Sequence, residues 1–143
     1  QYSLESLNPE STVFDEVRAV LSGASDGYIR NLLAAFLFKG DDVKKKVKVL
    51  SGGEKSRLVI AVLMSQNCNL LVLDEPTNHL DITSREILLE TLKAYEGTII
   101  FVSHDRYFLK ELADIVYEVD KGGIELYPGR YDYYLEKKGM DSL

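Results

Sequence analysis

The sequence predicts an α/β fold with a parallel sheet and a separate helical region in front of it. After residue 69, short apolar runs alternate with segments of helical periodicity, in the order strand, helix, strand, helix, strand. This alternation is typical of parallel strands joined by crossover helices. Residues 1–70 carry mainly helical patterns instead, which indicates a helical subdomain inserted before the sheet.

Composition and charge narrow the class of protein. A length of 143 residues favours one domain. No apolar run approaches the ~18 residues of a membrane span, and no signal peptide is visible. The single cysteine, Cys68, excludes an internal disulfide, which fits a reducing compartment, so we expect a cytoplasmic protein. The net charge of −6 argues against a broad nucleic-acid-binding surface.

The segment Lys39–Lys48 departs locally from this acidic balance. It holds five lysines against Asp41 and Asp42, a local charge of +3. Two interpretations stay open here, a solvated loop or helix face and a contact with a polyanion.

Three helices are expected before the first strand. One lies near Thr12–Leu21, with Ser11 or Thr12 as its N-cap. A second lies near Gly27–Phe38, where apolar residues recur at helical spacing. The third, at Glu54–Ser65, is apolar on nearly every face, which is typical of a buried helix.

The strands follow. Leu70–Leu73 and Thr98–Val102 are short, continuous apolar runs, so we expect both to be buried on both faces. A helix at Thr83–Tyr95 separates them. The remaining elements are a helix at Arg106–Ala113, strands at Ile115–Val119 and Ile124–Tyr127 around a Gly122-Gly123 turn, and a helix at Tyr131–Lys137.

Two carboxylates end the first strand, in the stretch "LLVLDEP". Ligands of open α/β sheets bind outside the carboxyl ends of the strands. Asp74 can hold Mg²⁺, which prefers oxygen ligands, and Glu75 can orient or deprotonate an attacking water. Pro76 holds Glu75 in an extended conformation. The alternative is a strand end that simply turns polar at the surface.

The second strand also ends in polar residues, Ser103-His104-Asp105. A strand–helix–strand crossover makes the two strands parallel, so Asp74, Glu75 and His104 should meet at one edge of the sheet. His104 then fits a residue that senses or orients a terminal phosphate. Taken alone, a histidine is more often an ordinary polar residue than a catalyst.

The stretch "LSGGE" opens the third helix. Ser51 is a good N-cap, and Gly52 and Gly53 let a phosphate approach the backbone closely. The free N–H groups and the dipole of the helix favour an anion. Taken alone, the stretch is also a common loop-to-helix joint.

Together these motifs resemble an ATP-binding cassette (ABC) ATPase. "LSGGEKSRL" resembles the ABC signature, "LLVLDEP" the Walker B strand, "NHLD" the D-loop and "SHD" the switch histidine. "DEPTNHLD" with "SHDRYFL" is similar to ABC-F proteins, which carry two cassettes in one polypeptide, have no transmembrane domain and are associated with the ribosome and translation. The segments around "FLFKGDD" and "YPGRYDYY" resemble the second cassette more than the first.

The resemblance implies a fold, a cofactor set and a role for each site residue. It implies a P-loop NTPase-like sheet, with residues 1–49 as the helical subdomain and residues 50–143 as the signature helix and the C-terminal half of the catalytic core. ATP and Mg²⁺ would bind between this cassette and a second one. The implied roles are a grip on the partner cassette's ATP by Ser51, Gly52 and Gly53, Mg²⁺ binding by Asp74, catalysis by Glu75 and His104, a dimer-interface contact by Asp81, and a Q-loop contact by Gln1.

The sequence departs from the family in one respect. It contains no glycine-rich P-loop ending in Lys-Ser or Lys-Thr. In this family the P-loop strand lies between the strand that ends at His104 and the one at Ile115–Val119, so a slot is expected there. We therefore expect part of one cassette of a longer protein, inactive alone. A transporter ATPase subunit, a chromosome-maintenance ATPase and a purely structural fragment are the alternatives.

Overall fold

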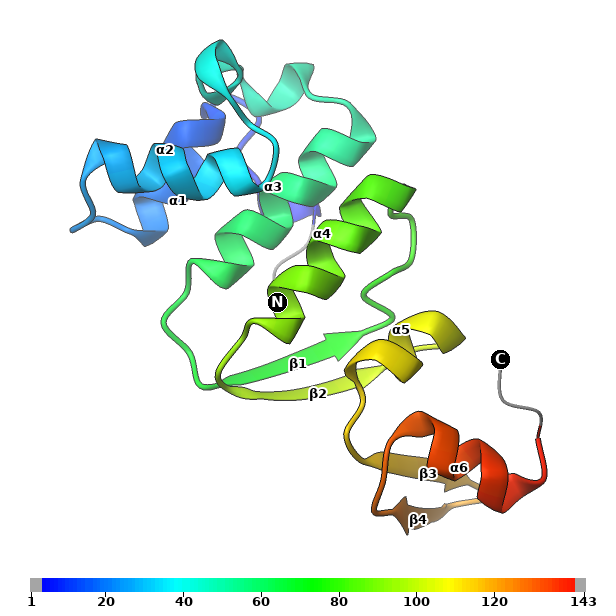
Figure 1. Ribbon diagram of the computed structural model, residues 1–143. Coiled ribbons are helices and arrows are strands. Elements are labelled where there is room, and N and C mark those ends of the chain that lie inside the picture. Colours follow the sequence, from blue (N-terminus) through cyan, green and yellow to red (C-terminus); the bar gives the residue numbers. More distant parts are fainter. Residues whose placement is uncertain (1–3, 141–143) are drawn as a thin grey trace. The chain divides into compact units, whose positions relative to one another are not determined.

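The computed structural model describes residues 4–140, which form parts of two compact units (Figure 1). The first unit includes the residues up to Leu71 together with His79–Thr98. The second includes Val72–Asn78 and the residues from Ile99 onward. Across the described range, no helix is both long and apolar enough to cross a membrane.

Helices make up most of the first unit. Each α-helix begins after a residue whose side-chain oxygen accepts a backbone N–H from the first turn. Thr12 does this for the first helix, which confirms it as an N-cap. The helices are α1 (Val13–Val20), α2 (Asp26–Ala35), α3 (Gly52–Met64) and α4 (Ile82–Lys93), and the short 3₁₀ turns are η1 (Leu4–Ser6), η2 (Gly40–Lys44) and η3 (Val47–Val49).

Helix α2 ends earlier than its apolar pattern predicts. The pattern continues to Phe38, but Leu37 has a φ of 64° and therefore cannot continue a right-handed helix. Phe36 and Phe38 are nevertheless buried. They join the core as loop residues, which explains why their spacing looked helical.

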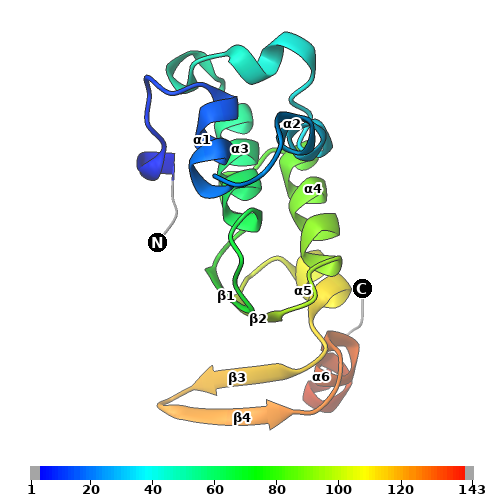
Figure 2. The ribbon, with the colours of Figure 1, turned by 90° about the vertical axis from the view of Figure 1, so that its left-hand side faces the viewer.

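The core of the first unit lies around α3. Figures 1 and 2 show α4 beside α3, and α1 packs against both α2 and α3. The prediction of a buried third helix is confirmed for most of its faces, although Val59 and Leu63 stay half-buried. The best-buried apolar side chains of this core are Val13, Val17, Ile29, Leu33, Phe38, Leu58, Ala61, Val62 and Leu92.

Strands β1 (Leu70–Asp74) and β2 (Thr98–Val102) pair with each other. Thr98 N–H donates to Asn69 O at 2.9 Å, and Glu75 N–H donates to Val102 O at 2.8 Å. The partners advance in the same direction along both strands, so the pair is parallel, as predicted.

The prediction that both strands are buried on both faces is wrong. Leu71 is 4% exposed, but Val72 is 72% and Val102 60% exposed. Alternate residues therefore face solvent. The physical reason is that burial of a strand depends on the layers around it, and in the described part of the chain this sheet has two strands with one face open.

The second unit contains an antiparallel hairpin of β3 (Val116–Asp120) and β4 (Gly123–Tyr127). Lys121 and Gly122 form its two-residue turn, with φ values of 45° and 78°, as a type I′ turn requires. In the described residues β3 pairs with β4 and not with β2. The slot expected between β2 and β3 stays a prediction that this pairing is compatible with.

Two helices complete the second unit, α5 (Arg106–Leu112) and α6 (Tyr131–Lys138). Figure 2 shows α6 beside the hairpin. Tyr127 and Tyr134 meet edge to face, and the Tyr134 hydroxyl donates to Glu118 at 3.1 Å. Lys138 forms an ion pair with the same carboxylate at 2.5 Å. These contacts join α6 to the hairpin.

Candidate nucleotide-binding site

The first turn of α3 is closed by a reciprocal capping box. Ser51 Oγ accepts the N–H of Glu54 at 3.2 Å, and Glu54 Oε2 accepts the N–H of Ser51 at 2.8 Å. The N–H of Ser51 is the main cause that lowers the pKa of Glu54. The helix start is therefore fixed by the chain itself, with the remaining N–H groups of its first turn outside the intrahelical ladder.

Gly52 and Gly53, although adjacent, lie in different surroundings. A Cβ at Gly52 would meet nothing within 4 Å. A Cβ at Gly53 would overlap Asp81 Oδ2 and lie 3.2 Å from Asp81 Cγ. The backbone at Gly52 is thus open to an incoming group, whereas the side of Gly53 is already covered by the chain.

Asp81 is the N-cap of α4. Its Oδ1 accepts the N–H of Ser84 at 2.7 Å, and the Ser84 hydroxyl lies 3.5 Å from Gly53 O. Hydrogen bonds from Ser84 lower the pKa of the Asp81 carboxyl, chiefly those of its hydroxyl. The predicted D-loop residue therefore lies against the predicted signature turn.

Glu75 stands at the carboxyl end of β1 in a left-handed conformation, with a φ of 45°. Its N–H donates to Val102 O, and its Oε2 accepts the N–H of His104 at 3.2 Å. Non-glycine residues rarely adopt this conformation, and when they do they cluster at functional sites. The prediction that Pro76 keeps Glu75 extended is wrong, because the chain turns at Glu75, where Asn78 N–H donates back to Glu75 O.

The two carboxylate oxygens of Glu75 differ. Oε1 is buried and has no hydrogen-bond partner among the described residues. His104 Nε2 lies 3.5 Å from it, within ion-pair distance but not aligned as a hydrogen bond. The Glu75 side chain is 20% exposed, whereas that of His104 is 96% exposed. The site therefore contains one buried acceptor without a donor among the described residues, beside an imidazole that faces solvent.

Asp74 is exposed and precedes Glu75 directly. Within residues 4–140 no group of three or more His, Cys, Asp or Glu side chains is arranged to hold a metal ion. Magnesium commonly takes one or two carboxylates and fills its other positions with water and substrate phosphates. One exposed carboxylate at a strand end fits that donor set.

The predicted residues thus fall into two clusters. Glu75 and His104 come together in the second unit, with Asp74 next to them in the chain. Ser51, Gly52, Gly53 and Asp81 come together in the first unit. Gln1 lies outside the described residues.

Two residues of the site were missed from the sequence. Glu54 carries the capping box, and the pattern Ser-x-x-Glu at residues 51–54 is the known signature of that motif. Arg57 lies 3.9 Å from Asp81 Oδ2 with its side chain 14% exposed. No local sequence signal identifies it, because its partner comes from a different helix.

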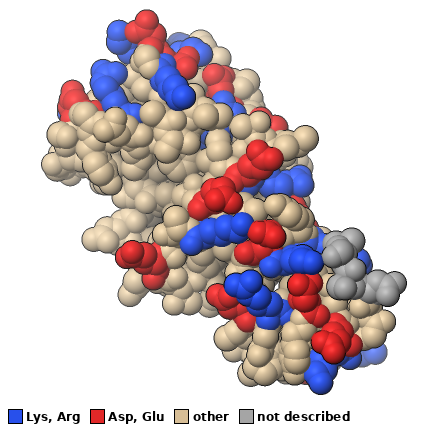
Figure 3. Space-filling model, viewed as in Figure 1, with Lys and Arg blue, Asp and Glu red and all other residues tan. Residues whose placement is uncertain are grey.

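The lysine-rich segment is charge-balanced by nearby acids. Lys46 and Lys48 both pair with Glu10, and Lys45 pairs with Asp42 and Glu54. Figure 3 shows basic and acidic side chains intermingled at this end of the helical unit. Of the two interpretations, this pairing favours the solvated face over the polyanion contact.

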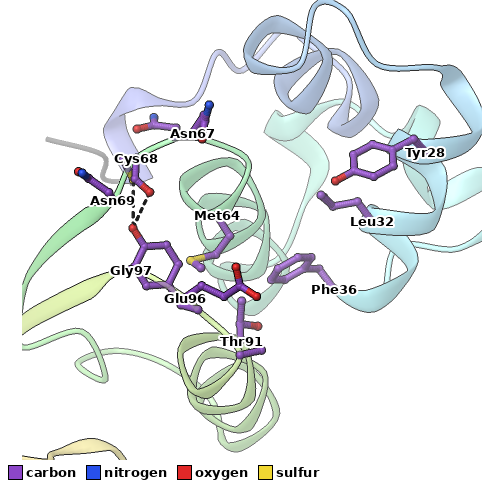
Figure 4. A pocket seen from close by; sticks show the side chains of 13 residues that line it. Tyr28, Leu32, Phe36, Met64, Asn67, Cys68, Asn69, Thr91, Glu96 and Gly97 are labelled. Carbon is purple, nitrogen blue, oxygen red and sulfur yellow. Dashed lines mark hydrogen bonds between the residues drawn. The ribbon is translucent and has the colours of Figure 1, made fainter.

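An open cavity of about 730 Å³ lies elsewhere in the first unit, between α2 and the ends of α3 and α4 (Figure 4). Tyr28, Phe36 and Met64 line it, and the Tyr95 hydroxyl donates to Cys68 O at 2.7 Å at its edge. It shares no residue with the predicted site.

Comparisons with known proteins give the family of the chain. The family model described as "ABC transporter" matches residues 1–78. "Putative ATP-binding protein YdiF" of Bacillus subtilis is 52% identical over 92% of this chain and 21% of its own length. "ABC transporter F family member 5" of Arabidopsis thaliana is 47% identical over 96% of this chain and 20% of its own length. The chain spans about a fifth of the length of these curated relatives.

Solved structures show the same fold. A crystal structure of the archaeal ribosomal stalk protein aP1 with the archaeal ribosome recycling factor aABCE1 matches with a TM-score of 0.67 and 24% identity, over 92% of this chain and 28% of that one. A structure named "RNase-L Inhibitor" matches with a TM-score of 0.65 and 25% identity, over the same shares. The α/β fold class predicted from the sequence is therefore confirmed.

The family model covers residues 1–78 of 143, more than half of the chain, and F family members stand among its relatives at 47% identity. The chain belongs to the ABC transporter family.

Proposed function

We propose that this chain is part of an ABC-F-type ATPase that binds and hydrolyses ATP with Mg²⁺ where two cassettes meet. The observation that carries the proposal is Glu75. It is held in a left-handed conformation at the end of β1, with one oxygen fixed by His104 N–H and the other buried without a hydrogen-bond partner in the described residues.

Glu75 is the proposed general base. A water bound to its free Oε1 would be oriented for in-line attack on the terminal phosphorus. As the new P–O bond forms, the bond to the leaving diphosphate oxygen breaks, and the proton of the water passes to Glu75. His104 lies 3.5 Å from the same oxygen and is free to contact the terminal phosphate.

Asp74 is proposed to bind Mg²⁺, because its carboxylate is exposed and it directly precedes Glu75. Bound Mg²⁺ would neutralise charge on the phosphate oxygens. The P-loop that cradles those phosphates is not part of this sequence. Gln1, aligned with the Q-loop by resemblance, would act on the same metal or water.

The first turn of α3 is proposed to act on a different ATP, the one held by a second cassette. Its capped start, the open backbone at Gly52 and the helix dipole favour the terminal phosphate of that nucleotide. Asp81 would then lie at the interface between the cassettes. On this proposal the described residues supply two half-sites, so the chain alone is inactive.

The ribosome is the proposed partner of the whole protein. The motifs resemble those of ABC-F proteins, and one structural neighbour is named as an archaeal ribosome recycling factor in complex with a ribosomal stalk protein. Sedimentation of the full-length polypeptide from a cell extract tests this. We expect the polypeptide to sediment with ribosomes in the presence of ATP. Its recovery with membranes instead would contradict the assignment.

Substitution of the base tests the catalytic proposal. Glu75→Gln in the full-length polypeptide keeps the side-chain shape but cannot accept the proton, so we expect ATP turnover to fall by about 10²-fold or more. Glu86→Gln, at an exposed position on α4, is the matched charge control and should retain the normal rate. Near-normal turnover in Glu75→Gln would remove Glu75 from its role.

A further inference from the structure

The carboxylate of Asp81 lies where the starts of α3 and α4 approach each other. One oxygen, Oδ1, accepts the N–H of Ser84 and so caps α4. The other, Oδ2, faces Gly53 and the guanidinium of Arg57. A single side chain therefore contacts the first turns of two helices.

Gly53 has no room for a side chain because of Asp81. An added Cβ would overlap Asp81 Oδ2, so the carboxylate would have to shift, and that shift disturbs the bond that Oδ1 accepts from Ser84 N–H. Gly52 faces open space within 4 Å. A side chain at Gly53 would therefore displace the Asp81 carboxylate, whereas one at Gly52 would displace nothing.

Arg57 lies on the side of Asp81 that Oδ2 faces. It lies one helical turn after Gly53, on the same face of α3. Its side chain is 14% exposed, its guanidinium lies 5.9 Å from the centre of the Phe38 ring, and its Nη1 is 3.9 Å from Asp81 Oδ2. Among the described residues Arg57 Nε is buried without a hydrogen-bond partner. The Asp81 side chain is 51% exposed, so the two groups form a long, partly solvated ion pair in which only the arginine is mostly buried.

We propose that Arg57 and Asp81 are a positioning pair that holds the first turn of α3 against the start of α4, so that the two segments move as one body. This inference rests on the proposed function in one respect, since those segments are the ones assigned to the partner's nucleotide. It adds that the phosphate-facing turn is set by contacts inside the same cassette, with Arg57 as a residue that touches no nucleotide.

A double-mutant cycle on this chain, without nucleotide, tests the contact between Asp81 and the first turn of α3 at Gly53. Gly53→Ala should lower the urea midpoint and speed amide exchange at residues 52–54 by about fivefold, as for loss of a helix cap. Asp81→Ser keeps an N-cap oxygen but removes Oδ2, so Gly53→Ala should have little further effect in that background. Gly52→Ala is the matched control and should leave exchange unchanged. Equal effects of Gly53→Ala in both backgrounds, or an equal effect of Gly52→Ala, would overturn the role of Asp81 in holding the first turn of α3.

Kinetics of the full-length polypeptide separate positioning from mere stability. Arg57→Ala should raise the ATP concentration for half-maximal turnover severalfold with a smaller effect on kcat, and Arg57→Lys should recover part of the loss. A fall in kcat alone, or no rescue by lysine, would contradict the positioning role. Coupling in the exchange experiment without any ATP turnover in the unmodified polypeptide would leave the pair standing and overturn the proposed function instead.

Discussion

Replacing Ser51 by alanine isolates the contribution of the cap that shapes the phosphate-facing turn. The change removes the Oγ that accepts Glu54 N–H at 3.2 Å, whereas the reciprocal bond from Ser51 N–H to Glu54 Oε2 at 2.8 Å can persist. Because one of two capping bonds is lost, we expect a cost of about 1 kcal/mol in the free energy of unfolding. With an m-value of roughly 2 kcal/mol/M, the urea midpoint should fall by roughly 0.5 M.

Circular dichroism during urea unfolding measures this shift. Ser51→Thr retains the hydroxyl and should unfold close to the unmodified chain. Ser22→Ala, in an exposed turn before α2, is the matched control for loss of a hydroxyl. Should Ser51→Ala unfold at the same urea concentration as Ser22→Ala, or Ser51→Thr as early as the alanine variant, the capping argument would be refuted.

The pH dependence of the urea midpoint tests the other capping bond, the one that Glu54 accepts. The pKa of Glu54 is lowered in the fold, chiefly by the N–H of Ser51. Its contribution is therefore complete above the ordinary glutamate pKa of about 4.3 and is lost as the pH falls through the lower folded value. Glu54→Gln should accordingly lie below the unmodified chain in urea midpoint at pH 7, with a gap that narrows in acid. A gap that widens in acid would give the opposite sign and refute the assignment.

Three further outcomes are expected. Gly52→Asp should abolish ATP-dependent association of cassettes in the full-length polypeptide, measured by gel filtration, because its carboxylate would repel the phosphate; unchanged association would contradict the grip. Leu92→Ala, at a side chain that is 1% exposed, should cost about 2–5 kcal/mol of unfolding free energy in a urea titration. Glu118→Gln should loosen α6, which hydrogen exchange would detect as faster amide exchange in α6 and not in α4, because the charged partner of Lys138 is lost.

Much of the fold was predictable because local chemistry determines it. The N-cap at Thr12 and the polar ends of the two parallel strands follow from short-range rules, and each is confirmed. Asp74, Glu75 and His104 were expected to meet at one edge of the sheet from strand order alone, and the Glu75 carboxylate does accept the N–H of His104. The sequence could place these groups because a parallel crossover leaves little freedom in which strand ends adjoin.

The remaining features depend on partners that no local pattern encodes. Val72 and Val102 are as apolar as a buried strand requires, yet they face solvent, because burial depends on which layers are present. The left-handed turn at Glu75 was missed because the following proline argues for an extended residue. The Arg57–Asp81 contact joins two helices, so neither residue reveals it from its own neighbours.

The surroundings of Glu75 and the start of α3 differ in which hydrogen bonds the chain itself already makes. At Glu75 the backbone strain, of order 1–3 kcal/mol, is offset by bonds to Val102 O and His104 N–H, so the carboxylate is aimed before any substrate arrives. Among the described residues one of its oxygens lacks a donor, which the attacking water of the proposed reaction would provide. At α3 the capping bonds are already complete, and the open element is the bare backbone at Gly52. In the proposed function, Glu75 is therefore preorganised for a water and the helix start for an anion, and these are the two different ligands that phosphoryl transfer to water brings together.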